Sequence, residues 1–198
     1  MYVKSITKDE VSEMPLIQFE GKIIIATTPD TITRALEEIK DFDIVGFDTE
    51  SKPAFKKGQF NHVAMVQIST HDTAYLLRIS KWGIIPALEE FLTNTTQLKI
   101  GLALDDDIKA LQKRQWFEPG SFIDLNKYVV KLGVKNAGVR NLSGIFMGRK
   151  VSKSQQTSNW ESEHLSPQQQ TYAATDAWIC LKIWDVISAI ESRQSGNE

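Results

Sequence analysis

Two acidic side chains directly follow an apolar segment. Residues 44–47 are apolar and β-branched, which predicts a strand, and Asp48 and Glu50 stand where that strand should emerge from the core. Because strand side chains alternate between faces, Asp48 and Glu50 share one face and can both reach one cation. A polar strand end without chemistry is the alternative for this pair taken alone.

A third acid, Asp107, lies in the first turn of a predicted helix. Helical spacing places it on the same face as Ala110 and Leu111, so it points inward. Asp106 shares its face with lysines and is exposed, while Asp105 is placed to cap the helix. The alternative is that all three are solvated acids that favour the helix dipole.

The fourth acid, Asp176, lies in a long helix predicted to start near Ser166 and Pro167. It lies beside an apolar stripe that continues along the helix. Tyr172 is four residues earlier, so its phenol stacks over the carboxylate on the same face. A tyrosine–aspartate pair tied up by structural hydrogen bonds is the alternative.

Four inward carboxylates would repel each other by about 1 to 4 kcal/mol per pair at contact distance, so their convergence needs a cation. No histidine or arginine is embedded in these segments, and oxygen-only ligation suits Mg²⁺ or Mn²⁺ rather than zinc. Two such ions about 3.5 to 4 Å apart can activate a water and stabilise the leaving oxygen of a phosphodiester. The predicted chemistry is phosphodiester hydrolysis.

The composition is that of a globular protein: 198 residues, of which 41% are hydrophobic and 24% charged. Lys plus Arg total 23 against 25 Asp plus Glu, so the chain lacks the overall positive charge that would indicate a nucleic-acid binder. A polyanion would have to be held locally or through metals. Cys180 is the only cysteine, which excludes a disulfide framework and fits a reducing compartment. No window approaches the roughly 20 apolar residues of a membrane span. We therefore expect a cytoplasmic protein without a membrane partner.

The elements that would position these acids alternate between strands and helices. Three antiparallel-looking strands precede strand–helix–strand alternation and then helices, which predicts an α/β domain with a mixed sheet covered by helices. A Ser/Gln-rich connector at 152–158 resembles a loop, and the last residues, 191–198, are expected to be a frayed tail. The predicted strands are 22–26, 44–47, 62–69, 74–79, 98–104 and 121–125, and the predicted helices are 31–40, 84–92, 105–115, 126–132, 139–147 and one from about 166.

Three segments in order carry a resemblance to a known family: VGFDTESKP, KIGLALDDDIKAL and YAATDA. With them the sequence resembles the DEDDy branch of the DEDD 3′-5′ exonucleases, close to the Werner syndrome protein exonuclease domain and ribonuclease D. The family aspartate of the second segment falls on Asp107, the acid that the helical face also selects. The likeness covers roughly residues 42–190, preceded by a βα extension at 20–41, so 1–198 would form a single exonuclease domain.

The resemblance implies a ribonuclease H-like fold, a mixed sheet with three antiparallel strands plus parallel strands. It implies removal of nucleotides from the 3′ end of a nucleic acid as nucleoside monophosphates, with Tyr172 orienting the attacking water. The residues implied to bind two divalent ions, Mg²⁺ or Mn²⁺, are Asp48, Glu50, Asp107 and Asp176. A catalytically inactive nucleic-acid-binding or scaffold module of the same fold is the alternative function. The sequence leaves open DNA versus RNA, the preferred end structure and the oligomeric state.

Two basic clusters and three aromatic residues are candidates for substrate contacts. The lysines and arginine could grip phosphates, with ordinary solvated side chains as the alternative. Phe55, Phe60 and Trp160 are candidates for stacking on bases, and for Trp160 the alternative is core packing. The basic candidates are Lys52, Lys56, Lys57, Arg149, Lys150 and Lys153.

Overall fold

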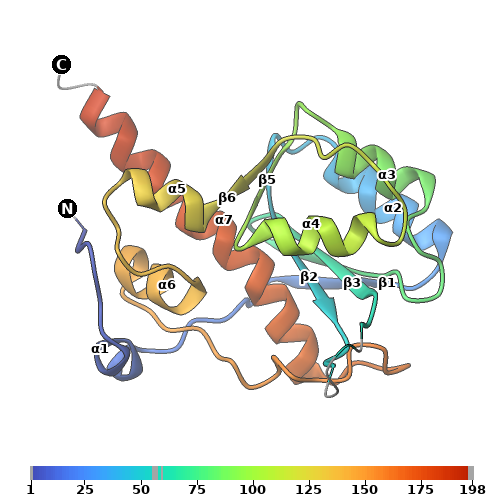
Figure 1. Ribbon diagram of the computed structural model, residues 1–198, viewed down its shortest axis with the longest axis horizontal. Helices are drawn as coiled ribbons and strands as arrows, with labels where there is room; N and C mark the ends of the chain where they lie inside the picture. The colour runs from blue at the N-terminus through green and yellow to red at the C-terminus, as the bar shows by residue number, and fades with distance from the viewer. Residues whose placement is uncertain (1, 55–57, 59, 196–198) are drawn as a thin grey trace.

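A six-stranded sheet forms the centre of the computed structural model, which describes residues 2–54, 58 and 60–195 (Figure 1). The strand order is β1-β4-β3-β2-β5-β6. Strand β3 is antiparallel to both of its neighbours, β2 and β4, whereas β1, β5 and β6 pair in parallel with their neighbours. The mixed sheet is therefore confirmed. The strands are β1 Lys22–Ala26, β2 Ile44–Ser51, β3 Val63–Ser69, β4 Thr73–Arg78, β5 Leu98–Gly101 and β6 Phe122–Asp124.

Helices cover both faces of the sheet. Apolar side chains of α2, α3 and α4 pack on one face in a core that includes Phe47, and those of α5, α6 and α7 pack on the other with Ile100. Figure 1 shows α7 running alongside β2, with α1 and α6 on its other side. None of the described helices combines the length and apolar character needed to cross a membrane. The helices are α1 Lys8–Glu13, α2 Pro29–Ile39, α3 Pro86–Thr93, α4 Leu104–Gln112, α5 Leu125–Lys131, α6 Val139–Met147 and α7 Pro167–Ser195.

The start of α4 differs from the sequence prediction. Strand β5 ends at Gly101, and Ala103, not Asp105, is the N-cap residue, in the left-handed region with φ of 57°. The backbone N–H groups of Ala103 and Leu104 donate to the carboxylate of Asp124 at 3.1 and 3.2 Å. The helix start is therefore held by an acid from β6, and the prediction that Asp105 caps the helix is wrong.

The two ends of the chain are more helical than predicted. Helix α1 carries a capping box in which the backbone N–H of Thr7 donates to Glu10 at 2.7 Å, and the pattern analysis missed it. Helix α7 continues to Ser195, where a frayed tail from residue 191 was expected. The Tyr128 hydroxyl donates to the Glu191 carboxylate at 2.8 to 2.9 Å, which ties this last part of α7 to α5.

The backbones of β2 and α7 touch at Gly46. A Cβ at this position would lie 2.0 Å from the carbonyl oxygen of Ala177, so only glycine allows the helix to lie this close. Ala177 directly follows Asp176 in the chain, and Gly46 is two residues before Asp48 on the same face of β2. The close approach therefore brings the acid of α7 beside the acids of β2.

Candidate active site

Three of the four predicted acids meet between β2 and α7. Asp48 and Glu50 come from the last half of β2 and Asp176 from α7, and one carboxylate oxygen of each lies within 4.8 Å of the others. All three residues are half-buried, so the set is not sealed from solvent. The alternation that places Asp48 and Glu50 on one face of the strand agrees with this arrangement.

Asp107 lies next to this three-acid set rather than within it. The hydroxyl of Thr49 donates to the Asp107 carboxylate, which joins α4 to β2 between the two acids of the strand. The charge of Asp107 contributes to raising the pKa of both Asp48 and Glu50, so it belongs to the same electrostatic site. The sequence analysis missed Thr49, although its place between the two acids puts it on the opposite face of β2, toward α4.

Tyr172 contacts Asp176 as the helical spacing predicts. The Tyr172 phenol and the Asp176 carboxyl interact closely enough that each shifts the pKa of the other, and the ring centroid of Tyr172 lies 6.0 Å from that of Trp160. Trp160 itself is fully buried, in a cluster with Met65 and Leu165. The structure therefore favours the alternative given for Trp160, core packing, over stacking on a base, and the buried ring supports Tyr172 from inside the core.

Burial makes these carboxyl groups hold their protons. It raises the pKa of Glu50 from 4.5 to about 9, with the charges of Asp176 and Asp107 adding to the effect. It also raises the pKa of Asp107 to about 6 and that of Asp176 to about 7. The pKa of Asp48 is raised in the same way, first by burial and then by the charges of its acidic neighbours. Without a cation, the site is therefore partly protonated at neutral pH.

We expect the metal-free protein to lose stability as the pH rises. The folded state keeps protons on Glu50 and Asp176 that the unfolded chain releases near pH 4, so unfolding releases protons between about pH 5 and about pH 9 and stability falls across that range. The fall should amount to several kcal/mol, because each unit by which folding raises a pKa corresponds to about 1.4 kcal/mol. Urea unfolding at several pH values measures it, and saturating Mn²⁺ should reduce the fall. A metal-free stability that rises over this range would contradict the prediction.

The predicted basic contacts differ in the partners that the structure gives them. Lys52 forms an ion pair with Glu161 at 3.4 Å, so a phosphate would have to replace that carboxylate. The positive charge of Lys153 lowers the pKa of Asp176, so this lysine does act on the acidic site. Phe55, Lys56 and Lys57 lie outside the described residues.

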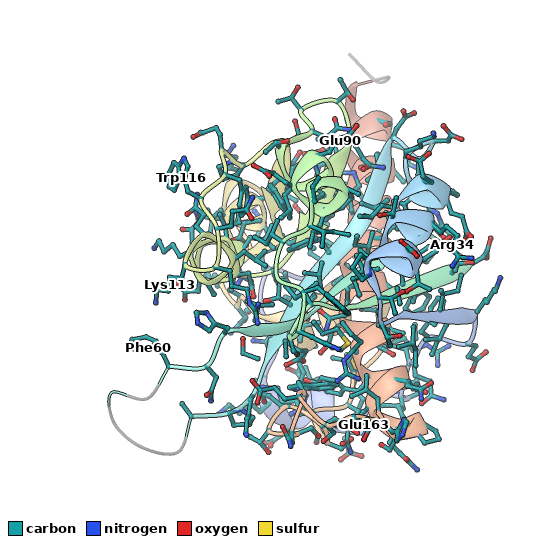
Figure 2. All side chains as sticks on the ribbon, turned by 90° about the vertical axis from the view of Figure 1, so that its right-hand side faces the viewer. Arg34, Phe60, Glu90, Lys113, Trp116 and Glu163 are labelled. Atoms are coloured by element: carbon teal, nitrogen blue, oxygen red, sulfur yellow. The ribbon has the colours of Figure 1, made fainter. Side chains whose placement is uncertain are left out.

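Among the predicted aromatic contacts that the structure describes, Phe60 is the exposed one. Its side chain is 79% exposed, and the Lys113 ammonium lies 4.3 Å from its ring centroid. Figure 2 shows the two residues side by side at one edge of the molecule. This pair of aromatic ring and cation, unlike Trp160, is available to an incoming ligand.

The chain matches the family model described as 3′-5′ exonuclease over residues 23–190. Among curated proteins, it is 30% identical over 192 residues to the bifunctional 3′-5′ exonuclease/ATP-dependent helicase WRN of Mus musculus, covering 91% of this chain and 13% of that protein. It is 29% identical over 200 residues to a 3′-5′ exonuclease of Arabidopsis thaliana, covering 92% of this chain and 69% of that protein. The chain thus corresponds to a small part of the mouse protein.

Solved structures share the fold. The Nibbler EXO domain of Aedes aegypti superposes with a TM-score of 0.75 at 25% identity, over 88% of this chain and 91% of that one. Escherichia coli RNase D superposes with a TM-score of 0.73 at 20% identity, over 88% of this chain and 46% of that one. The ribonuclease H-like exonuclease fold is therefore confirmed. With a family model that spans most of its length and an acidic set at the end of β2, the chain belongs to the 3′-5′ exonuclease family.

Proposed function

We propose that the protein is a metal-dependent exonuclease that removes nucleoside monophosphates from the 3′ end of a nucleic acid. The observation that carries the proposal is the three-acid set of Asp48, Glu50 and Asp176, whose oxygens lie within 4.8 Å of one another. Carboxylates this close repel each other, and a bound cation offsets that repulsion. Membership of the 3′-5′ exonuclease family supplies the reaction class.

The donor set fits hard divalent ions. It consists of carboxylate oxygens alone, which suit Mg²⁺ or Mn²⁺, and the residues proposed to hold two ions are Asp48, Glu50, Asp107 and Asp176. When bound, such ions activate a water and stabilise the leaving oxygen of a phosphodiester. The chain's own part is to hold the oxygens in place, which Thr49 does for Asp107 by its hydrogen bond.

Tyr172 is proposed to position the attacking water. Burial raises its pKa, and the charges of Asp176 and Glu50 raise it further, so the phenol keeps its proton at every physiological pH. It therefore serves as a hydrogen-bond partner and not as a general base. The packing on Trp160 and the interaction with Asp176 hold the phenol at the acidic site.

The substrate is proposed to enter beside Tyr172 and Asp176. A cavity of about 340 Å³ opens there, lined also by Gln18, Ser152 and Thr171, which offer neutral hydrogen-bonding groups. Lys153, whose charge reaches Asp176, is proposed to contact a phosphate. Lys52, Lys56 and Lys57 are proposed to contact further phosphates of the substrate. Phe60 is proposed to stack on a base.

We also propose that residues 1–198 form one exonuclease domain, with a core at 42–190 and a βα extension at 20–41, and that it acts in the cytoplasm. Strand β2 supports the first point because it contributes Phe47 to one core and Ile44 to the other. Cys180, buried as a free thiol, is consistent with a reducing compartment.

The direct test is digestion of 5′-labelled oligonucleotides, as matched DNA and RNA in single-stranded and recessed-duplex form, with Mg²⁺ or Mn²⁺. We expect products shortened one nucleotide at a time from the 3′ end, release of nucleoside monophosphates, and no reaction with EDTA. The same panel decides between DNA and RNA. Binding without shortening, internal cleavage, or activity that persists in EDTA would contradict the proposal.

A further inference from the structure

Strand β3 carries a fully buried side-chain amide that nothing described so far uses. Gln67 is 0% exposed, and neither its Nε2 nor its Oε1 has a hydrogen-bond partner among the described residues. Burying an amide without a partner costs stability, and natural proteins pair nearly all such groups. An unpaired amide at the centre of a sheet therefore calls for a ligand or a partner that is engaged in another state of the protein.

The sheet register identifies that partner. Gln67 is paired directly with Asp48 across the antiparallel β2–β3 ladder, and with Leu76 on its other side in β4. Directly paired residues project from the same face with Cβ atoms about 4.5 to 5.5 Å apart. Leu76 offers no polar group, so the Asp48 carboxyl is the group next to Gln67 in the register that can accept an amide hydrogen bond.

We propose that Gln67 is a positioning residue for Asp48 and would donate an amide N–H to the Asp48 carboxylate when the site holds a cation. The inference rests on the proposed function, because it assumes that Asp48 binds a divalent ion. Groups that bond to metal-ligating side chains orient those ligands and strengthen metal binding. Hydrogen bonds of this kind are often long or misaligned without a ligand and tighten when it binds.

A second buried glutamine shows what a purely structural role looks like. Gln97 is 3% exposed, and its Nε2 donates to the backbone carbonyls of Ile39 and Phe42 at 2.9 and 2.6 Å. Its amide thus fastens the start of β5 to the end of α2. Gln97 is the matched control for Gln67, because both are buried glutamines and only one of them has its donor satisfied within the fold.

The test compares Gln67→Leu and Gln67→Met with Gln97→Leu, each measured by urea unfolding without metal and by calorimetric titration with Mn²⁺ alone. Both Gln67 variants should keep or exceed the metal-free stability of the native protein, because they remove an unpaired amide. They should bind Mn²⁺ about 10- to 100-fold more weakly. Gln97→Leu should show the reverse, with lower stability and unchanged Mn²⁺ affinity.

Four outcomes would overturn the inference. Native Mn²⁺ affinity in both Gln67 variants would remove Gln67 from the site and leave the proposed function intact. Failure of both variants to fold, or a loss of metal-free stability with unchanged Mn²⁺ affinity, would show that the amide is structural. If the native protein itself does not bind Mn²⁺, the proposed metal site and the inference are both wrong.

Discussion

We expect Asp48→Asn to lower turnover by about 10³-fold or more, because it removes one of the oxygens proposed to hold the metal ions, whose contribution is several kcal/mol of transition-state stabilisation. The same substitution should make the metal-free protein more stable at pH 8. Burial and three acidic neighbours raise the pKa of Asp48, so its charge opposes folding there. Removing that charge should raise the free energy of unfolding by about 1 to 3 kcal/mol, which is the scale of repulsion between nearby carboxylates.

The opposite signs distinguish a functional acid from a structural one. An acid that stabilises the fold through hydrogen bonds would lower stability when replaced, and both effects would then be losses. Asp106→Asn is the matched control, because Asp106 is an exposed acid next to Asp107 in the first turn of α4. It should leave turnover and stability nearly unchanged. Steady-state digestion measures turnover, and urea unfolding without metal measures the free energy of unfolding. An Asp48→Asn protein that is less stable and still active would contradict the expectation.

The acidic site was predictable where it depends on local periodicity. Alternation along β2 is enough to place Asp48 and Glu50 on one face, and helical spacing is enough to place Tyr172 over Asp176. These rules follow from backbone geometry alone and need no knowledge of the rest of the fold. Asp107 was chosen over its two neighbours for the same reason, and the Thr49 hydrogen bond is consistent with that choice.

The prediction failed where contacts come from distant parts of the chain. The sequence left Trp160 open between base stacking and core packing, and the structure buries its ring beside Tyr172 in a cluster with Met65 of β3. Asp105 looked like a cap because it is an acid in the first turn of a helix, whereas Asp124 reaches the free N–H groups from the next strand. Neither contact leaves a signal in the spacing of nearby residues.

Gln67 is an intermediate case. A glutamine inside the apolar run Val63–Ile68 is visible in the sequence, and β3 is buried over its whole length. The pattern alone could not say what the amide faces, because that depends on the register between β2 and β3. A one-residue slip would place Gln67 on the other face of the sheet, away from Asp48.

The second large effect concerns the contact between β2 and α7. We expect Gly46→Ala to lower the free energy of unfolding by about 3 kcal/mol or more, at the upper end of overpacking costs. The new Cβ would meet the Ala177 carbonyl oxygen at 2.0 Å, and neither backbone can turn aside as a side chain would. If the protein folds with α7 displaced by about 1 Å, turnover should fall by about 10²-fold, because Asp176 moves away from the acids of β2.

Gly144→Ala separates this effect from the general cost of adding a methyl group to a buried glycine. Gly144 is buried in α6, but its new Cβ would meet only side-chain atoms, at 3.1 to 3.3 Å, which can shift. Alanine also favours the helix by about 1 kcal/mol, so the stability should change by less than about 1 kcal/mol. The atoms concerned are Ile6 Cδ1, Val11 Cγ2 and Met14 Sδ. Urea unfolding and digestion of both variants decide the point: equal effects at the two glycines would mean that the close approach of α7 to β2 does not hold the acidic site together.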